Sequence, residues 1–296
     1  MLTHLAMLAD EPRVAAYRAA IERHAPGRFV LELGTGSGVL SIFAARAGAR
    51  RVLAVEESAI AGLAAELFAA NAPTIELAVR SSRDLVLPDD QRAEVIVHEL
   101  LGADPLAEGL LPTIADARRR LLAPGGRLLP SRLELYATGV ALTEAPVDRA
   151  VAQTQTTAIA ARHALDLAPL SRALAALPDR AYQHTVRGAS FELLTEPTLL
   201  HDLDLTTVDE DACAATLTRT LTATRAGTLS AVLLHFRAHL DHDLVLSNGP
   251  ELPETHWGRR ITALSHSRPV HPGDRLPLQV TREATLHHER LRLDWG

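Results

Sequence analysis

The first half of the chain alternates between helical and extended patterns of apolar residues. Apolar side chains recur at helical spacing in four segments: 10–24, 40–47, 59–70 and 112–122. Short apolar runs typical of buried strands lie between them, at 29–31, 51–55, 75–79 and 94–97. Strands that alternate with helices predict right-handed crossovers and a mostly parallel sheet. The turn-forming run APGG at 123–126 is expected to end the last of these helices.

The pattern changes after Pro130. Residues 146–187 have a helical and loop-like pattern, whereas residues 188–296 carry short alternating runs broken by Gly, Pro, Asn and Asp. Such runs predict antiparallel strands. A length of 296 residues suits roughly two domains. We therefore expect an α/β domain over residues 1–130 and a second domain over residues 131–296.

Composition and charge narrow the class of protein. The chain is 47% apolar and 22% charged, has no apolar run long enough to span a membrane, and has a single cysteine, Cys213. Its first twenty residues lack the pattern of a secretory signal. These features predict a cytoplasmic protein without a membrane partner. All thirty basic residues are arginine and the net charge is −6, which excludes nucleic-acid binding by bulk electrostatics and favours a cationic partner.

A glycine-rich turn follows the first predicted strand. Gly34, Gly36 and Gly38 lie between that strand and a helix, where backbone approaches a ligand closely and helix N–H groups favour negative charge. The dinucleotide fingerprint would place its last glycine where Val39 stands, so the pattern disfavours a nicotinamide enzyme and favours S-adenosylmethionine. Glu56, twenty residues after Gly36, is placed to hold the ribose hydroxyls.

Two readings of this turn remain open. In one, the glycines and Glu56 bind the cofactor, and Ser82, just past the third strand, faces its adenine. In the other, the glycines only make a tight turn and Glu56 caps the next helix. The order of strand, turn, helix and acid favours the first reading.

Two carboxylates lie on the loop after the fourth strand. Glu99 and Glu108 are nine residues apart, at the edge where open α/β sheets bind ligands. Carboxylates held close together repel unless a cation lies between them, and a guanidinium matches their oxygens two at a time. The alternative is two solvated acids on a surface loop, but their place beside a cofactor turn favours a guanidinium clamp.

Five runs of sequence together resemble the protein arginine methyltransferases. They are MLTHLAMLADEPRVAAYR, LELGTGSGVLSIFAARAGARRVLAVEES, VIVHELLGADPLAEGLLPTI, LLAPGGRLLP and PETHW. The combination is specific, because the spaced acids and the Thr255-His256-Trp257 triplet are rarely found together elsewhere. The resemblance covers both halves of the chain. It implies a Rossmann-like S-adenosylmethionine domain and an antiparallel β-barrel interrupted by a helical dimerisation arm at 146–187, whose residues 166–187 would pack on a second copy.

The resemblance also implies roles for single residues. Glu99 and Glu108 match the family's two active-site glutamates, which grip the substrate guanidinium. Arg13 matches the arginine that pairs with the cofactor's carboxylate, and Glu56 matches the ribose-binding acid. The remaining matches are Met7 beside the substrate nitrogen, Trp257 in the substrate site, and Pro130, often cis, between the domains.

Asp10 and His256 match a pair that the fold brings together from the two ends of the chain. Taken alone, Asp10 would be a helix N-cap and His256 a surface imidazole of the barrel. As a pair they would either carry a proton out of the site or lock the two domains together.

The sequence departs from the family pattern at three places. Only three residues precede His4, so the aromatic YFxxY helix that closes over the cofactor is expected to be missing, and a partner, the substrate or a neighbouring subunit would close the site. Leu100 stands where the family commonly has a tryptophan, and His98 stands where it has a serine. Both differences change the expected width of the pocket. The run LAEGLLP around Glu108 is nearer to the divergent branch of the family.

Three functions follow from these observations. The first is methyl transfer, without a metal, from S-adenosylmethionine to arginine in a protein or peptide. The second is methylation of free arginine or another small guanidine in biosynthesis. The third is an inactive scaffold that keeps the cofactor fold, which the intact acids at positions 99 and 108 disfavour. In each case a homodimer is expected from the arm.

Overall fold

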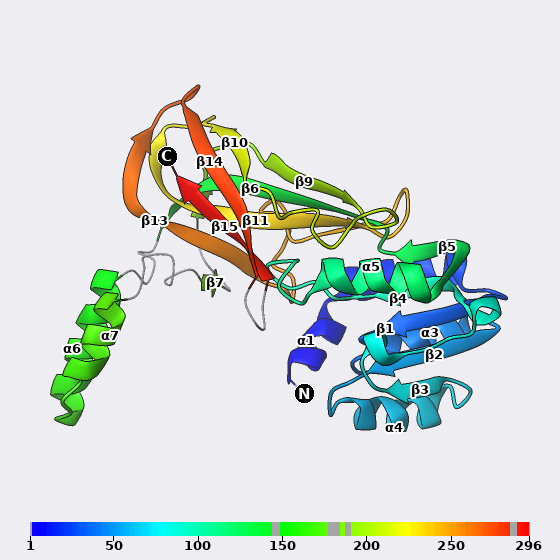
Figure 1. Cartoon of the computed structure of the whole chain (residues 1–296). Coiled ribbons are helices and arrows are strands. Elements are labelled where there is room, and N and C mark those ends of the chain that lie inside the picture. Colours follow the sequence, from blue (N-terminus) through cyan, green and yellow to red (C-terminus); the bar gives the residue numbers. More distant parts are fainter. Residues whose placement is uncertain (1, 144–148, 177–183, 187–190, 285–288, 296) are drawn as a thin grey trace.

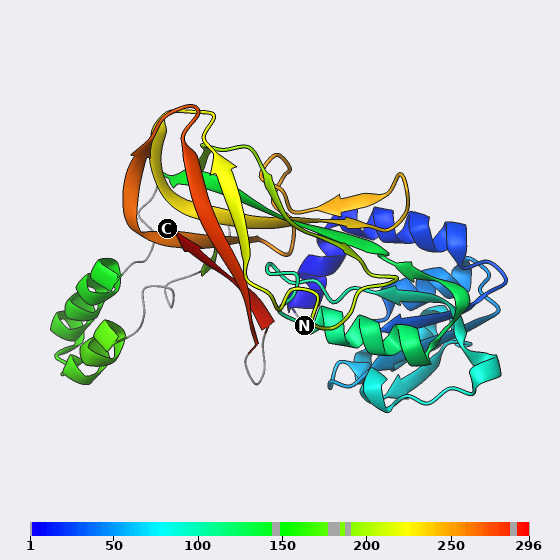
Figure 2. The same cartoon turned by 45° about the horizontal axis from the view of Figure 1, so that its top comes forward.

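The computed structural model describes residues 2–143, 149–176, 184–186, 191–284 and 289–295. Within these ranges the chain forms a parallel sheet with helices, an antiparallel domain, and a two-helix arm that projects away from both (Figure 1). The arm remains separate from the parallel sheet when the molecule is turned (Figure 2). The antiparallel domain lies between the arm and the parallel sheet in both views.

The parallel sheet has five strands in the order β3-β2-β1-β4-β5. Their bounds are Phe29–Leu33 for β1, Arg51–Glu56 for β2, Glu76–Val79 for β3, Ala93–His98 for β4 and Leu122–Leu129 for β5. All five residues of β1 are buried, as expected for a central strand covered on both faces. The chain leaves β1 toward β2 on one side and returns as β4 on the other, so the ligand-binding switch point lies where β1 and β4 end.

Helices flank this sheet and lead into its strands. Their bounds are Leu2–Ala9 for α1, Glu11–His24 for α2, Val39–Arg46 for α3, Ala61–Asn71 for α4 and Leu110–Arg120 for α5, with short 3-10 turns at Ser82–Asp84 (η1) and Asp89–Gln91 (η2). Asp10 begins α2 because its side chain accepts a hydrogen bond from the N–H of Arg13, and Pro12 stands in the first turn. None of the helices in the described ranges is long and apolar enough to cross a membrane.

The antiparallel domain consists of two sheets. Strands β7, β13, β11, β6 and β8 follow one another in the larger sheet, with β12 paired to β11 and β9 paired to β6, while β10, β14 and β15 form the smaller. The bounds are Arg132–Leu142 (β6), His184–Val186 (β7), Phe191–Leu193 (β8), Thr198–Asp204 (β9), Leu217–Thr222 (β10), Gly227–His239 (β11), Val245–Ser247 (β12), Arg259–Val270 (β13), Arg275–Ala284 (β14) and Glu289–Trp295 (β15). Closure of these sheets into a barrel stays a prediction.

The arm consists of α6 (Arg149–His163) and α7 (Ala168–Ala176). Both lie inside the segment 146–187 that the sequence predicts to be helical. Three large apolar side chains of the arm, Ile159, Leu165 and Leu170, are exposed. Residues 146–148, 177–183 and 187 of the predicted arm lie outside the described residues. Residues 184–186, which the sequence assigns to the arm, instead form β7 and pair with β13.

The run APGG follows the end of α5 at Arg120, as the sequence predicts, but it also lies inside β5. Leu122 pairs with Ala93 and Arg127 with Val95, so residues 123–126 form an irregularity in the pairing of β5 with β4. Residues 2–9, for which the sequence makes no prediction, form α1.

The parallel sheet and the antiparallel domain share one continuous hydrophobic core across Pro130. β5 ends at Leu129, the peptide bond before Pro130 is cis, and β6 begins at Arg132. The imidazole of His98 is fully buried beneath this junction and its Nε2 lies 3.0 Å from the carbonyl oxygen of Pro130. Burial lowers the pKa of His98 to about 4, so the ring is neutral and Nε2 donates to that carbonyl.

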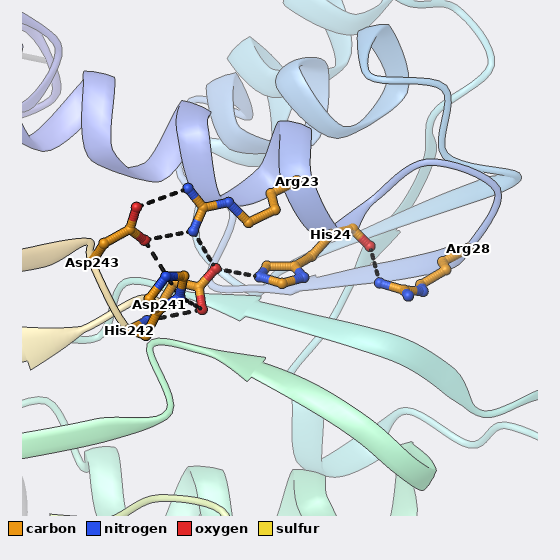
Figure 3. A network of polar contacts seen from close by, with 6 residues as sticks. All are labelled: Arg23, His24, Arg28, Asp241, His242 and Asp243. Atoms are coloured by element: carbon orange, nitrogen blue, oxygen red, sulfur yellow. Dashed lines mark hydrogen bonds and ion pairs between the residues drawn. The ribbon is translucent and has the colours of Figure 1, made fainter.

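A second link between the two parts is polar and joins the end of α2 to the turn between β11 and β12 (Figure 3). The guanidinium of Arg23 donates to Asp241 at 2.7 Å and to Asp243 at 2.5 Å. Nε2 of His24 lies 2.8 Å from the same carboxylate of Asp241. The helix that precedes β1 is therefore attached to the antiparallel domain.

Candidate active site

The glycine turn lies at the carboxyl end of β1. Gly34 and Gly36 have φ angles of 65° and 55°, a region that residues with a side chain rarely adopt. A Cβ atom at Gly36 would lie 3.0 Å from Cε1 of His4, so the missing side chain lets α1 approach the turn. Both glycines line a cavity of about 710 Å³.

Gly38 stands at the N-cap of α3, with a φ of 84°, and is not among the residues that line the cavity. A Cβ atom there would collide with the ring of Phe68 on α4. The third glycine therefore serves the start of α3 and its packing, and its role in cofactor binding stays a prediction.

Glu56 lies at the end of β2 with its carboxylate directed to the glycine turn. Its Oε2 accepts a hydrogen bond from the N–H of Gly36 and its Oε1 from the N–H of Ser58, both at 2.9 Å. The alternative reading, that Glu56 caps the next helix, is wrong because the N-cap of α4 is Ile60. The carboxylate is thus fixed at the cavity wall, and its remaining lone pairs are available to a ligand.

Glu99 follows β4 and is bound from both halves of the molecule. Its Oε2 lies 2.8 Å from Nη2 of Arg13, and its Oε1 accepts a hydrogen bond from Nε1 of Trp257 at 3.0 Å. Both charged side chains are about nineteen-twentieths buried. Burial raises the pKa of Glu99 to about 7, although Arg13 and Trp257 oppose this shift.

Glu108 reaches the same cavity from the other end of the loop, just before α5. The residue is exposed to the solvent of the cleft and makes no ion pair or hydrogen bond with any described residue. Partial burial of its carboxyl group nevertheless raises its pKa. Glu108 is also close enough to Glu99 for its charge to raise the pKa of that group. The two predicted acids therefore lie on one cavity instead of being solvated separately on a surface loop.

Asp10 and His256 meet, although 246 positions separate them. Nδ1 of His256 lies 2.8 Å from Oδ2 of Asp10, and the N–H of His256 donates to the same oxygen at 2.9 Å. Burial alone would raise the pKa of Asp10, but the hydrogen bonds from His256 and Arg13 lower it. Asp10 is therefore both the N-cap of α2 and the partner of His256, as its two predicted roles require.

His256 and Trp257 complete the cavity wall from the antiparallel domain, and Asp10 lies behind it. Both residues line the cavity, whereas Asp10 does not and contacts its wall through His256 and the N–H of Arg13. Their rings lie 4.2 Å apart between centroids, and Trp257 packs edge-on against Phe236 at 5.1 Å. This packing aims the indole N–H at Glu99.

The other predicted residues also lie at the cavity. Met7 and Ser82 line it, and the carbonyl oxygen of Met7 accepts a hydrogen bond from Nη1 of Arg13 at 3.2 Å. Leu100 lines it too, with Cδ2 placed 3.0 Å from where a Cβ of Gly34 would lie. His98 does not line the cavity, because it points to Pro130, so it cannot set the width of the pocket.

Several further residues, which the sequence did not single out, also line the cavity. They are His4, Leu8, Glu32, Glu57, Arg80 and Arg83. Burial raises the pKa of Glu32 to about 7, and its Oε2 accepts hydrogen bonds from Thr35 and Ser41. Glu32, Glu57 and Arg80 lie within two residues after predicted strands and could have been proposed from that position alone. His4 and Leu8 lie on α1, for which the sequence gives no such signal.

The described residues contain one group with metal-ligand geometry, Asp241, His242 and Asp243, and it lies outside the cavity. Arg23 already forms ion pairs with both of its carboxylates. The cavity itself instead offers a fixed carboxylate at the glycine turn and two further carboxylates. This arrangement suits binding of a nucleoside beside a cation.

Comparisons with known proteins match both halves of the chain. Residues 160–296 match the family described as the arginine methyltransferase oligomerization subdomain, and residues 17–133 match ribosomal protein L11 methyltransferase. Protein arginine N-methyltransferase PRMT10 of Oryza sativa subsp. japonica is 28% identical over 96% of this chain and 81% of its own length. Protein arginine N-methyltransferase 6 of Danio rerio is 28% identical over 99% of this chain and 85% of its own.

Solved structures share the fold over nearly the whole chain. The Trypanosoma brucei PRMT1 enzyme-prozyme heterotetrameric complex with AdoHcy aligns with a TM-score of 0.79 at 25% identity, covering 99% of this chain and 93% of that one. Protein arginine methyltransferase 10 of Arabidopsis thaliana aligns with a TM-score of 0.80 at 24% identity, covering 98% of this chain and 91% of that one. The arrangement of a parallel-sheet domain followed by an antiparallel domain is therefore shared.

Proposed function

Because the chain belongs to the protein arginine methyltransferase family, we propose that it transfers a methyl group from S-adenosylmethionine to a guanidino nitrogen of arginine in a protein or peptide. The observation that carries the proposal is the meeting of Glu99, Glu108 and the glycine turn on one cavity. In the reaction a carbon–sulfur bond breaks and a carbon–nitrogen bond forms. The products are S-adenosylhomocysteine, a methylated arginine and a proton.

The cavity suits S-adenosylmethionine, which supplies an electrophilic methyl group on a sulfonium centre. The carboxylate of Glu56, fixed at the glycine turn by the N–H of Gly36, would hold the ribose hydroxyls. Arg13 would bind the carboxylate of the amino-acid tail. Its Nε is buried and has no hydrogen-bond partner within the described chain, so a donor is left for such a ligand. Ser82 would lie near the adenine.

The two glutamates would bind the guanidinium of the substrate as a clamp. A guanidinium is a poor nucleophile because its lone pairs are delocalised and its pKa exceeds about 12. Carboxylates on one side draw its positive charge toward the nitrogens that they bind and leave the third nitrogen richer in electron density. The residues act mainly by positioning and electrostatics, which together can lower a barrier by about 7 kcal/mol or more. Met7 would border the reacting nitrogen.

His256 would help to keep Glu99 in place through its contact with Trp257, and it would lie on the path by which the proton leaves the site. Its ring touches that of Trp257, which donates to Glu99, and Asp10 fixes it from behind. The same contact serves as a lock between α2 and the antiparallel domain. Both roles place His256 in the site and Asp10 as its positioning partner.

Two copies of the chain are proposed to form a homodimer through α6 and α7. Support comes from the match of residues 160–296 to a family named for oligomerization and from the exposed apolar side chains on the arm. The arm projects away from its own antiparallel domain (Figure 1), where a second copy can reach it.

A methyl-transfer assay by mass spectrometry tests the function. The purified chain and S-adenosylmethionine are incubated in turn with an arginine-rich protein or peptide, the same peptide with every arginine replaced by lysine, and free arginine. We expect mass gains of one methyl unit or more on the arginine peptide alone. Transfer to free arginine only would move the substrate to the class of small guanidines, and no transfer to any of the three would contradict the proposal.

A further inference from the structure

The loop that carries the two glutamates is attached to the antiparallel domain at two points. At its beginning, Trp257 donates to Glu99 at 3.0 Å. Near its middle, Nη1 of Arg260 donates to Oδ2 of Asp104. Trp257 and Arg260 are three residues apart, so one short segment at the start of β13 contacts both parts of the loop.

The second attachment is a buried ion pair. The side chains of Arg260 and Asp104 are 8% and 7% exposed, so the charges are almost entirely shielded from water. Arg260 stands in β13 between Thr185 of β7 and Leu234 of β11, and pairing on both sides fixes its backbone. A buried charge that loses its partner is strongly unfavourable, so the pair holds the loop to this strand.

Asp104 also forms hydrogen bonds within the loop, between the ion pair and Glu108. Its Oδ1 accepts a hydrogen bond from the N–H of Leu106 at 3.2 Å, and its carbonyl oxygen accepts one from Ala107 at 3.0 Å. The loop folds back on itself here: a Cβ atom at Gly102 would lie 3.1 Å from the carbonyl oxygen of Asp104 and 3.7 Å from Oε1 of Glu108. Asp104 therefore shapes the turn in which Glu108 sits.

Glu108 depends on this turn because no other described group holds its carboxylate. Glu99 is fixed by Arg13 and Trp257, whereas Glu108 has no ion pair or hydrogen bond with the described residues. We propose that Arg260 is a positioning residue that places Glu108 for guanidinium binding through its buried ion pair with Asp104. This inference rests on the proposed function of the two glutamates.

Two single variants and their double variant test the proposal. Asp104→Asn keeps an acceptor for Leu106 but removes the charge, and Arg260→Gln removes the donor fork. We expect each to lower kcat/KM for the arginine peptide about a hundred-fold, the size of effect that a misplaced reacting group produces. The Kd for S-adenosylhomocysteine, measured by calorimetry, should not change, because neither residue lines the cavity.

The double variant Asp104→Asn/Arg260→Gln shows whether the two residues affect activity through their ion pair or independently of each other. If Arg260 acts only through Asp104, the double variant loses no more activity than the worse single variant. Losses that multiply, or single variants with unchanged kcat/KM, would overturn the proposal. An equal loss of cofactor affinity would also overturn it, since the change would then be general.

Arg23→Gln is the matched control. Arg23 also joins the two domains by ion pairs, to Asp241 and Asp243, but it contacts no part of the loop (Figure 3). We expect near wild-type kcat/KM from this variant. If it lost as much activity as Arg260→Gln, weaker domain docking would explain both and the proposal would fail.

Hydrogen exchange gives a readout that does not depend on activity. Residues 100–108 should exchange faster in Asp104→Asn than in the wild type, and at the wild-type rate in Arg23→Gln. Unchanged exchange in Asp104→Asn would refute the role of the pair. An inactive wild type with faster exchange in Asp104→Asn would refute the proposed function instead, while the attachment of the loop would stand. Asp104→Asn also serves alone if Arg260→Gln does not fold.

Discussion

Glu99 and Glu108 face the same cavity from different surroundings. Glu99 is buried between Arg13 and Trp257, whereas Glu108 is open to solvent and has no ion pair with the described residues. The same substitution must therefore act differently at the two positions. Its effect on activity tests the clamp, and its effect on stability tests the environment of each carboxylate.

We expect Glu99→Gln and Glu108→Gln each to lower kcat by about a hundred-fold or more, because each removes a charge that the guanidinium requires. Only Glu99→Gln should also lower the free energy of unfolding, by about 2 kcal/mol, since it leaves the buried Arg13 without a counter-charge. Turnover and urea unfolding, both at pH 8, measure the two effects. Wild-type turnover in both variants would contradict the clamp.

The pKa of Glu99 sets a pH dependence. Burial raises this pKa to about 7, so the carboxyl group is largely protonated below that pH. A neutral carboxyl group binds the positively charged guanidinium of the substrate more weakly than a carboxylate does. We expect kcat/KM for the arginine peptide to fall about ten-fold per unit as the pH drops below 7. Glu32 has a similar pKa and lines the same cavity, so Glu32→Gln is the control. Loss of the acidic limb in that variant would assign it to Glu32 instead.

At the scale of elements, α2 depends on Asp10 for its start and for its link to the antiparallel domain. Asp10→Asn keeps an acceptor for the N–H of Arg13 but loses the charge beside His256. Asp10→Ala loses both and should cost about 1 kcal/mol more stability, the usual value of a helix cap. Thermal unfolding of the two variants measures this difference. Equal stabilities would show that the cap contributes nothing here.

The proposed homodimer would cover the exposed apolar side chains of the arm. We expect Ile159→Asp or Leu170→Asp to convert a dimer into a monomer, because a buried, unpaired carboxylate is unfavourable in an apolar interface. Sedimentation velocity of the variants and the wild type measures this. Leu199→Asp changes an exposed leucine of β9, outside the arm, and should leave the dimer intact. A monomeric wild type would contradict the proposal.

Sequence predicted the elements whose signals are local. The strand, glycine turn and acid at 29–56 follow in order along the chain, and the structure places them as expected. The run APGG follows the end of α5 as predicted, but its place inside β5 had no local signal, because the pairing of β5 with β4 is non-local. The Arg13–Glu99 and Arg260–Asp104 pairs had no local signal, since their partners are 86 and 156 positions apart. The close approach of Phe68 to Gly38 had no local signal either.

At the scale of the whole molecule, the ligand cavity takes its walls from both domains. Ligand binding should therefore stabilise the two domains together. At a concentration of S-adenosylhomocysteine a hundred times its Kd, we expect about 2.7 kcal/mol of added stability and a single, higher unfolding transition. Calorimetry measures the shift, and Glu56→Ala should abolish most of it. Two transitions of which only one responds would show that the domains unfold independently.

The contact of Asp10 with His256 also bears on how the enzyme is made. A ribosome-bound chain that stops short of residue 256 already contains the glycine turn and both glutamates, but not the imidazole and indole that brace them. A nascent chain of this kind therefore lacks the groups that hold Glu99 from the antiparallel domain. We expect methyl transfer to begin only after residues 256 and 257 have been synthesised and packed against the first domain.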